Sequence, residues 1–235
     1  MNNKEVTAII VARKGSVRVP GKSLLKINGV SLIERKILQL KQCKHIDRIV
    51  LGSDSDQMLE IGEKAGAEIV RRPDYYCDEE LASANEMIKN MMELVKTDVV
   101  AWTHCTNPFI SPETYDKAIE TFFQNQGKYD SLLSVVRFQE HLWDDKMQPL
   151  NYDPYAPRHT PSRELPVYHF QDGGIFIQPY DQMKSNNYFF GQKPYLFEIP
   201  ENEFLDINTE CDYRKALVFS QIYKLGVNKL WKQFL

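Results

Sequence analysis

The chain has 235 residues, 43% of them hydrophobic and 26% charged, and its formal net charge at pH 7 is −3. This length allows one large domain with a sizeable core, and the nearly balanced charge argues against a nucleic-acid-binding surface. No apolar run is long enough to span a membrane, and no signal-peptide pattern opens the chain. The four cysteines and five histidines lack metal-ligand spacing, so we expect reduced thiols in a cytoplasmic protein.

Apolar runs alternate with capped, amphipathic segments along the chain. Strands are predicted at 7–12, 48–52, 67–70, 98–103, 130–136, 167–177 and 195–199, and helices at 31–40, 56–65, 83–95, from 111 onward and at 209–223. Ser31 and Ser111 are typical helix N-caps, Gly66 is typical of a helix end, and a short extended piece is expected at 24–27. The alternation predicts one α/β domain over residues 1–235, with a mostly parallel sheet and helices on both faces.

The segment from about 137 to 166 interrupts this alternation. Prolines and aromatic residues are frequent in it, and helical periodicity is weak. Strand character returns after it, around Gly173-Gly174. We therefore expect the segment to leave the domain as an inserted arm or hairpin, after which the sheet resumes.

A basic, glycine-containing loop follows the first predicted strand. It reads Arg13-Lys14-Gly15-Ser16-Val17-Arg18-Val19-Pro20-Gly21-Lys22. Gly15 and Gly21 let the backbone approach a ligand closely, while free N–H groups and cationic side chains neutralise phosphate oxygens. It is not a Walker loop, because the two glycines are six residues apart and no helix start follows. The sequence favours an anion site here, with a solvated basic loop as the alternative.

The loop resembles the opening motif of the acylneuraminate (CMP-nonulosonic acid) cytidylyltransferase family. The residues that match this motif in order are Ala12, Arg13, Gly15, Ser16, Arg18, Pro20, Gly21 and Lys22. Val17 and Ser23 depart from it, because they stand where lysine and asparagine are usual. Further stretches match in the family's order over roughly residues 6–220. The resemblance implies a Rossmann-like sheet of the nucleotide-diphospho-sugar transferase type.

The resemblance also implies a CTP site built from the loop and from a second segment. The phosphates would be bound by Arg13, Ser16, Arg18 and Lys22, with Ala12 and Gly15 in the same motif. Arg72-Pro73 and Ser83 match positions that the family places near the cytosine base, where an arginine and a hydroxyl supply donors and acceptors. The alternative for these two positions is a surface arginine and an N-cap serine.

The sugar acid is expected at the carboxyl end of the predicted strand 98–103, where open α/β sheets bind ligands. The matching stretches supply His104, Thr106, Asn107, Arg158, Arg163, Tyr168, Asp172 and Gly173. His104 either keeps a fixed hydrogen bond, for example to the sugar, or acts as a base. Either arginine has the geometry to pair with the sugar carboxylate, with solvated arm residues as the alternative. Ile110 replaces an arginine that is usual in the family.

The stretch Asp206-Ile207-Asn208-Thr209 resembles the family's metal motif before the last helix. Asp206 and Asn208 would hold Mg²⁺, and an ordinary helix cap is the alternative for Asn208. The implied reaction is a direct attack of the sugar's anomeric hydroxyl on the α-phosphorus of CTP, giving a CMP-sugar and pyrophosphate. Arg13 and Lys22 would stabilise the developing charge, and Asp206, or a metal-bound hydroxide beside it, would take the proton.

The family resemblance further implies a homodimer, in which the arm of one subunit reaches the sugar site of the other. The departures at Val17, His104 and Asp172 favour a nine-carbon acid of the legionaminate type. The alternatives are an octulosonate, a phosphorylated small molecule as acceptor, or a catalytically silent CTP-binding protein. No nucleic-acid or membrane partner is expected.

Overall fold

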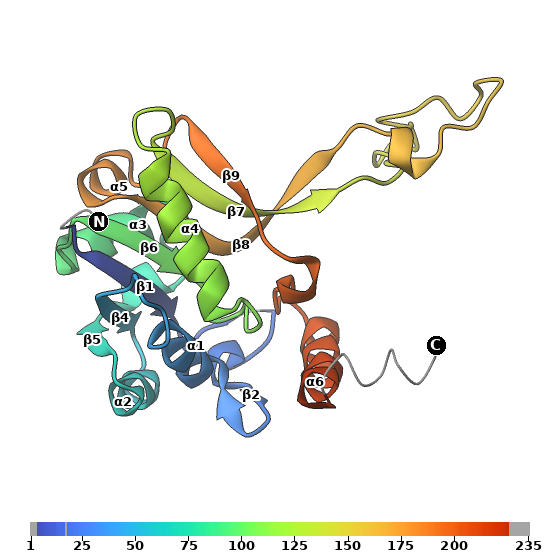
Figure 1. The fold of residues 1–235 in the computed structure, drawn as a ribbon. Helices are drawn as coiled ribbons and strands as arrows, with labels where there is room; N and C mark the ends of the chain where they lie inside the picture. The colour runs from blue at the N-terminus through green and yellow to red at the C-terminus, as the bar shows by residue number, and fades with distance from the viewer. Residues whose placement is uncertain (1–3, 17, 226–235) are drawn as a thin grey trace.

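A seven-stranded sheet forms the centre of the computed structural model, which describes residues 4–16 and 18–225 (Figure 1). In the order β5-β4-β1-β6-β8-β7-β9, the strands are β5 (Glu68–Arg71), β4 (Arg48–Ser53), β1 (Val6–Ala12), β6 (Val99–Thr103), β8 (Tyr168–Pro179), β7 (Ser131–Phe138) and β9 (Pro194–Glu198). β8 runs antiparallel to both of its neighbours, whereas the other paired strands of this sheet are parallel. The predicted mostly parallel α/β sheet is confirmed.

Helices cover both faces of the sheet. They are α1 (Leu32–Leu40), α2 (Asp56–Ala65), α3 (Ala84–Leu94), α4 (Pro112–Gln124), α5 (Tyr180–Asn186) and α6 (Glu210–Leu225). Side chains of α1, α2, α4 and α6 join Ile10 in one buried cluster, whereas those of α3 and α5 join Ile9 in a second. Ile9 and Ile10 are neighbours on β1, so they point to opposite faces. The expected helix layer on each face is confirmed.

The helix ends follow the local signals of the sequence. Ser31 and Ser111 each accept a hydrogen bond from the backbone N–H three residues further on, as N-caps do. Gly66 ends α2 in the left-handed conformation with φ 96°, which glycine adopts without steric cost. Within the described part of the chain, no helix is both long and apolar enough to cross a lipid bilayer.

Two parts of the chain differ from what the sequence predicts. The piece at 24–27 is not extended throughout, because a 3₁₀ turn covers Lys22–Leu24. The strand β2 (Lys26–Ile27) then pairs antiparallel with β3 (Val30–Ser31) in a small hairpin. Gly21 precedes the 3₁₀ turn with φ 62°, a left-handed conformation that turns the chain there. Helix α5 was not predicted, because its two buried side chains are too few to show a helical period.

β7 and β8 continue beyond the sheet as a two-stranded ribbon, which carries residues 139–167 away from the body of the molecule (Figure 1). The sequence predicts the inserted arm in this segment. The apolar side chains exposed on it include Trp143, Met147, Leu150 and Tyr155. The first four residues of β8 are exposed as well. The ribbon therefore presents apolar surface that the described part of the chain leaves uncovered.

Candidate active site

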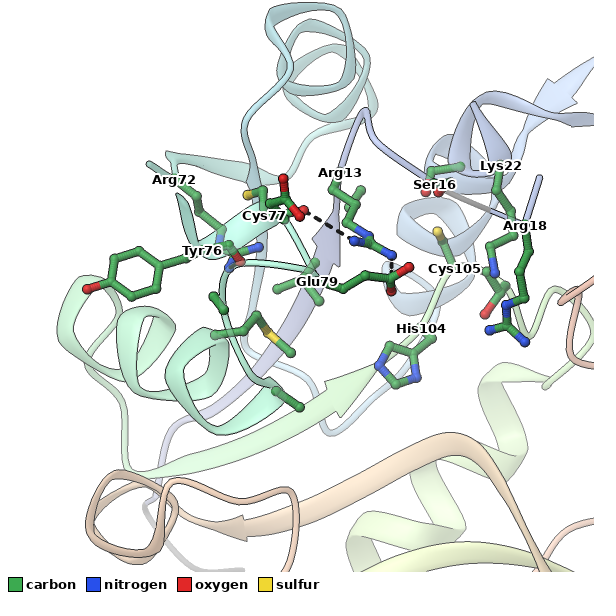
Figure 2. A pocket seen from close by; sticks show the side chains of 18 of the residues that line it. Arg13, Ser16, Arg18, Lys22, Arg72, Tyr76, Cys77, Glu79, His104 and Cys105 are labelled. Atoms are coloured by element: carbon green, nitrogen blue, oxygen red, sulfur yellow. Dashed lines mark hydrogen bonds and ion pairs between the residues drawn. The ribbon is translucent and has the colours of Figure 1, made fainter. Parts of the chain in front are cut away.

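A cavity of about 370 Å³ opens beyond the carboxyl ends of β1 and β6 (Figure 2). β1 lies between β4 and β6, so the cavity sits where the strand order reverses, which is where open α/β sheets bind ligands. The residues with a predicted role that line it are Ala12, Arg13, Ser16, Arg18, Lys22, Arg72, Ser83, His104, Thr106, Asp206 and Asn208. The fold therefore brings together four parts of the chain: the basic loop after β1, the segment with Arg72 and Ser83, the end of β6 with His104 and Thr106, and the metal motif with Asp206 and Asn208.

A buried carboxylate anchors the basic loop. Asp54, which is 4% exposed, accepts a hydrogen bond from the Lys14 backbone N–H at 3.0 Å. Asp54 directly follows β4, and β4 pairs in parallel with β1, so the sheet fixes where the loop begins. The sequence indicates a polar turn at Asp54 and no more, because the contact depends on which strands are neighbours. Gly15, although it belongs to the predicted motif, is exposed and does not line the cavity.

Lys22 supplies positive charge to the cavity. Burial lowers the pKa of its ammonium group, and the negative charge of Asp206 opposes that shift. Among the residues that the structure describes, no hydrogen bond or ion pair engages the Lys22 side chain. A partly buried ammonium group without such a partner has a strong tendency to bind an anion. Lys22 is therefore well placed for the phosphate contact predicted for it.

Arg13, in contrast, is already paired in the structure. Its guanidinium forms an ion pair with Glu79 and donates a hydrogen bond to the Cys77 carbonyl oxygen at 3.4 Å (Figure 2). Glu79 lines the same cavity from the segment before α3. The sequence gives no signal for Glu79, because the two partners are 66 residues apart. An anion that enters the cavity has to compete with the Glu79 carboxylate for Arg13.

Arg72 is a buried guanidinium without a carboxylate partner in the described residues. It is 2% exposed, and it donates to the Tyr76 carbonyl oxygen at 2.7 Å and to Asn90 Oδ1 at 3.4 Å. Burial lowers its pKa. Ser83 lines the cavity but also begins α3 in a capping box with Glu86. The N-cap alternative for Ser83 is therefore observed, and its hydroxyl is held by that cap.

His104 is held as a neutral ring with a defined tautomer. Trp102 Nε1 can only donate a hydrogen bond, and it donates to His104 Nε2 at 3.3 Å. Nε2 is therefore the acceptor nitrogen of the ring, and the ring proton lies on Nδ1. Nδ1 donates it to the Gly173 carbonyl oxygen at 2.7 Å. Burial lowers the pKa of His104, although the Gly173 contact and the Asp206 charge oppose this. Gly173 takes the single N–H of the ring in this structure, so the predicted hydrogen bond from His104 to the sugar would require that contact to be exchanged.

Asn107 and Asp172 lie behind the cavity and do not line it. They are 1% and 3% exposed, and Asn107 Nδ2 donates to the Asp172 carbonyl oxygen at 3.1 Å. The Asp172 carboxylate accepts from the Gly174 N–H at 3.2 Å, and burial raises its pKa. Gly173 has φ 73°, a left-handed conformation that favours glycine and accompanies the contact of its carbonyl with His104. The structure thus places these three predicted substrate residues in the support beneath the cavity.

The metal motif presents one buried, unpaired carboxylate oxygen. Asp206 Oδ1 is buried and has no hydrogen-bond partner among the described residues. Asp206 Oδ2 accepts from the side-chain amide of Asn208, whose own oxygen accepts from Arg18 Nη2 at 2.9 Å. Thr209 and Asp212 form the cap of α6, so Asn208 is not its capping side chain. An unpaired buried carboxylate oxygen indicates a missing cation or donor.

The donor set fits Mg²⁺ in the way this ion is usually held beside phosphates. In the described residues no group of three acidic, histidine or cysteine side chains gathers to form a complete site. Mg²⁺ usually takes one or two carboxylates and completes its shell with waters and substrate phosphates. Asp206 would provide the carboxylate. Asn208 turns its amide nitrogen toward Asp206 and its oxygen toward Arg18, so its contribution as a ligand requires the amide to turn.

Arg158, Arg163 and Tyr168 lie on the arm or at its base, outside the cavity of their own chain. Arg158 pairs with Glu164 at 2.8 Å, and the Arg158 and Arg163 side chains are 73% and 82% exposed. Tyr168 begins β8 and is 41% exposed. The structure therefore does not bring these three predicted substrate residues to the cavity of their own chain.

Comparison with known proteins gives a consistent result. A family model described as cytidylyltransferase matches residues 7–229. The pseudaminic acid cytidylyltransferase of Campylobacter jejuni is 25% identical over 226 residues, which cover 91% of this chain and 95% of that protein. The N-acylneuraminate cytidylyltransferase of Escherichia coli is 25% identical over 227 residues, covering 92% of this chain and 52% of that protein.

A solved structure of a CMP:2-keto-3-deoxy-manno-octonic acid synthetase complexed with CTP has the same fold. Its TM-score is 0.66 at 15% identity, and the match covers 94% of this chain and 99% of that one. The family match and these relatives make the chain a nucleotidyltransferase. With a family match over nearly its whole length, the chain belongs to the cytidylyltransferase family, and the resemblance to its CMP-nonulosonic acid members is confirmed.

Proposed function

We propose that this protein activates a nonulosonic acid by transferring CMP to it from CTP, with release of pyrophosphate. The observation that carries the proposal is the charge arrangement in the cavity. Three cations of the loop after β1, Arg13, Arg18 and Lys22, line the cavity together with Asp206, whose Oδ1 is unpaired. Such a cavity suits a phosphate chain beside a hydroxyl that must lose a proton. The likeness to a pseudaminic acid cytidylyltransferase supports a nine-carbon acid as the acceptor.

The mechanism we infer is a direct transfer without a covalent enzyme intermediate. The anomeric oxygen forms a bond to the α-phosphorus, the bond from that phosphorus to pyrophosphate breaks, and the hydroxyl proton passes to Asp206. Lys22 and Arg13 stabilise the negative charge that develops on the phosphate oxygens, once Arg13 has exchanged Glu79 for the nucleotide. Mg²⁺ held by Asp206 would add positive charge to the same phosphates.

The acceptor is proposed to be an acid of the legionaminate type, and the reaction is placed in the cytoplasm. The four free cysteines support a reducing compartment. The test is pyrophosphate release with CTP and Mg²⁺ across nonulosonic acids, an octulosonate and sugar phosphates. Release with one nine-carbon acid would support the proposal. Release with octulosonate alone or a phosphorylated acceptor alone would replace it, and CTP binding without any release would favour a silent binding protein.

Glu79→Gln is expected to tighten CTP binding roughly two- to fivefold, because exposed ion pairs contribute up to about 1 kcal/mol. The Arg13 and Glu79 side chains are 26% and 55% exposed, so solvent screens the pair. The substitution removes the charge that competes with the nucleotide phosphates and keeps the shape of the side chain. Calorimetric titration with CTP would measure the change. Weaker binding would indicate that Glu79 contributes to CTP binding, and the proposed competition between Glu79 and the phosphates for Arg13 would then be wrong.

We further propose that the arm of one subunit completes the sugar site of another in a homodimer. The exposed apolar side chains of the arm and the exposure of Arg163 support a second copy of the chain as partner. Arg163→Ala is expected to raise KM for the acid roughly tenfold or more, since hydrogen bonds to charged groups contribute about 1.5–3 kcal/mol, and to leave KM for CTP nearly unchanged. Arg214→Ala, on the exposed side of α6, is the control. Sedimentation as a fully active monomer would contradict the proposal.

A further inference from the structure

Lys36 is a fully buried lysine on α1, outside the cavity. Its exposure is 0%, and it shares the buried face of the helix with Leu32, Ile33, Ile37 and Leu40. Its ammonium nitrogen donates to the Asn107 carbonyl oxygen at 2.8 Å and contacts the Tyr115 hydroxyl at 2.7 Å. Within the described residues, no carboxylate forms an ion pair with it. A buried ammonium with neutral partners is costly, so its contacts need an explanation.

The surroundings of Lys36 disfavour its charge. Burial lowers the pKa of Lys36 to about 7, and Arg35 adds to this shift. Cys105, Cys43 and Asp172 oppose it. A methionine of similar length would fill the same space without this electrostatic cost. The reason for a lysine at this position therefore lies in the groups to which its nitrogen is hydrogen-bonded.

Lys36 is one of three side chains of α1 that hold the loop after β6. Arg35 Nε donates to the Pro108 carbonyl oxygen at 2.9 Å, and Gln39 Nε2 donates to the same oxygen at 2.8 Å. Together with the bond from Lys36 to Asn107, these contacts fix two consecutive carbonyl groups of the loop that begins with His104. Lys36 is the deepest of the three, because its side chain alone is completely enclosed.

The loop in turn fixes the metal motif. The Ile207 N–H donates to the Thr106 carbonyl oxygen at 2.9 Å, so the residue next to Asp206 is tied to the residue next to Asn107. Asn107 also reaches β8 through its bond to the Asp172 carbonyl oxygen. A displacement of the Asn107 carbonyl therefore reaches Asp206 through two residues, Thr106 and Ile207, and the hydrogen bond between them.

We propose that Lys36 is a positioning residue, which acts through the loop at Asn107 to place the Asp206 carboxylate for nucleotidyl transfer. The proposal rests on the function proposed above. It predicts that the loss of the Lys36 nitrogen changes the placement of Asp206 and spares the part of the basic loop held by Cys77 and Asp54. A residue with a merely structural role would affect both regions together through global stability.

The experiment compares Lys36→Met with Lys41→Met. Lys41 is exposed, and its nitrogen likewise donates to a backbone carbonyl, that of Ala65 at 3.3 Å. Lys36→Met is expected to lower kcat roughly ten- to hundredfold, because small misplacements of reacting groups have effects of this size. KM for CTP should rise by no more than the factor by which Mg²⁺ tightens CTP binding to the wild type, and Lys41→Met should match the wild type. Full kcat in a folded Lys36→Met protein would overturn the proposal.

Two further measurements keep the proposal testable. CTP binding is titrated with and without Mg²⁺, and Lys36→Met is expected to lose the part of the affinity that depends on Mg²⁺ while keeping the rest. If no acceptor gives pyrophosphate release but Lys36→Met still loses a dependence on Mg²⁺ that the wild type shows, the proposed function fails and the positioning role stands. If Lys36→Met does not fold, Gln39→Met is expected to give a smaller loss of kcat in the same direction, and an unchanged kcat would overturn the proposal.

Discussion

Replacing Lys22 by methionine is expected to lower kcat/KM for CTP about 10²–10³-fold, the usual effect of removing a preorganised charged donor from a transition state. The Lys22 ammonium is partly buried in the cavity, and no hydrogen bond or ion pair of the described chain satisfies it. Methionine keeps the length of the stem and its packing, so the change isolates the charge. Initial rates of pyrophosphate release at saturating acceptor would measure the loss.

The matched control for this substitution is Lys26→Met. Lys26 is exposed on β2, close in sequence to Lys22, and does not line the cavity. The same replacement there should change kcat/KM less than twofold, as is usual for exposed residues away from a site. Thermal unfolding of the Lys22 variant should stay near the wild-type value, because a partly buried charge is removed and no cavity is made. Wild-type turnover in Lys22→Met would exclude the role proposed for this residue.

The fold could be predicted largely because its signals are local. The N-cap at Ser31, the helix end at Gly66 and the apolar run of β1 each depend on a few adjacent residues, and the structure confirms all three. The 3₁₀ turn at Lys22–Leu24 was missed because the apolar pattern there is equally compatible with an extended segment. Helix α5 was missed because it is short and buries little.

The site was predictable where a motif runs along the chain, and less so where it depends on strand neighbours. The basic loop and the metal motif were expected from their own residues, and they meet at one cavity. Glu79 carried no signal, because its pairing with Arg13 follows from the packing of distant segments. The tautomer of His104 follows from Trp102 and from the antiparallel pairing of β6 with β8, which brings Gly173 to the ring.

Asp206→Asn is expected to reduce pyrophosphate release by at least 10²–10³-fold and to remove most of its dependence on Mg²⁺. The replacement has the same shape and loses the charge of a carboxylate whose Oδ1 is buried and unpaired. It also removes the charge that raises the pKa of Lys22, so the pKa of that ammonium should fall further. Magnesium titrations of the rate and of CTP binding would measure the loss of pyrophosphate release and the loss of its dependence on Mg²⁺. Glu210→Gln, an exposed carboxylate nearby, is the control.

Combining Asp206→Asn with Lys22→Met tests whether the two residues act on the same phosphates. If they act as one unit, the second substitution should cost much less in the double variant than alone, because groups that act together give strongly non-additive losses. Additive losses would mean that Lys22 and Asp206 serve separate steps, with Lys22 binding CTP and Asp206 taking the proton. Unchanged magnesium dependence in Asp206→Asn would indicate that other residues hold the metal. The unpaired oxygen of Asp206 would then serve as the proton acceptor and not as a metal ligand.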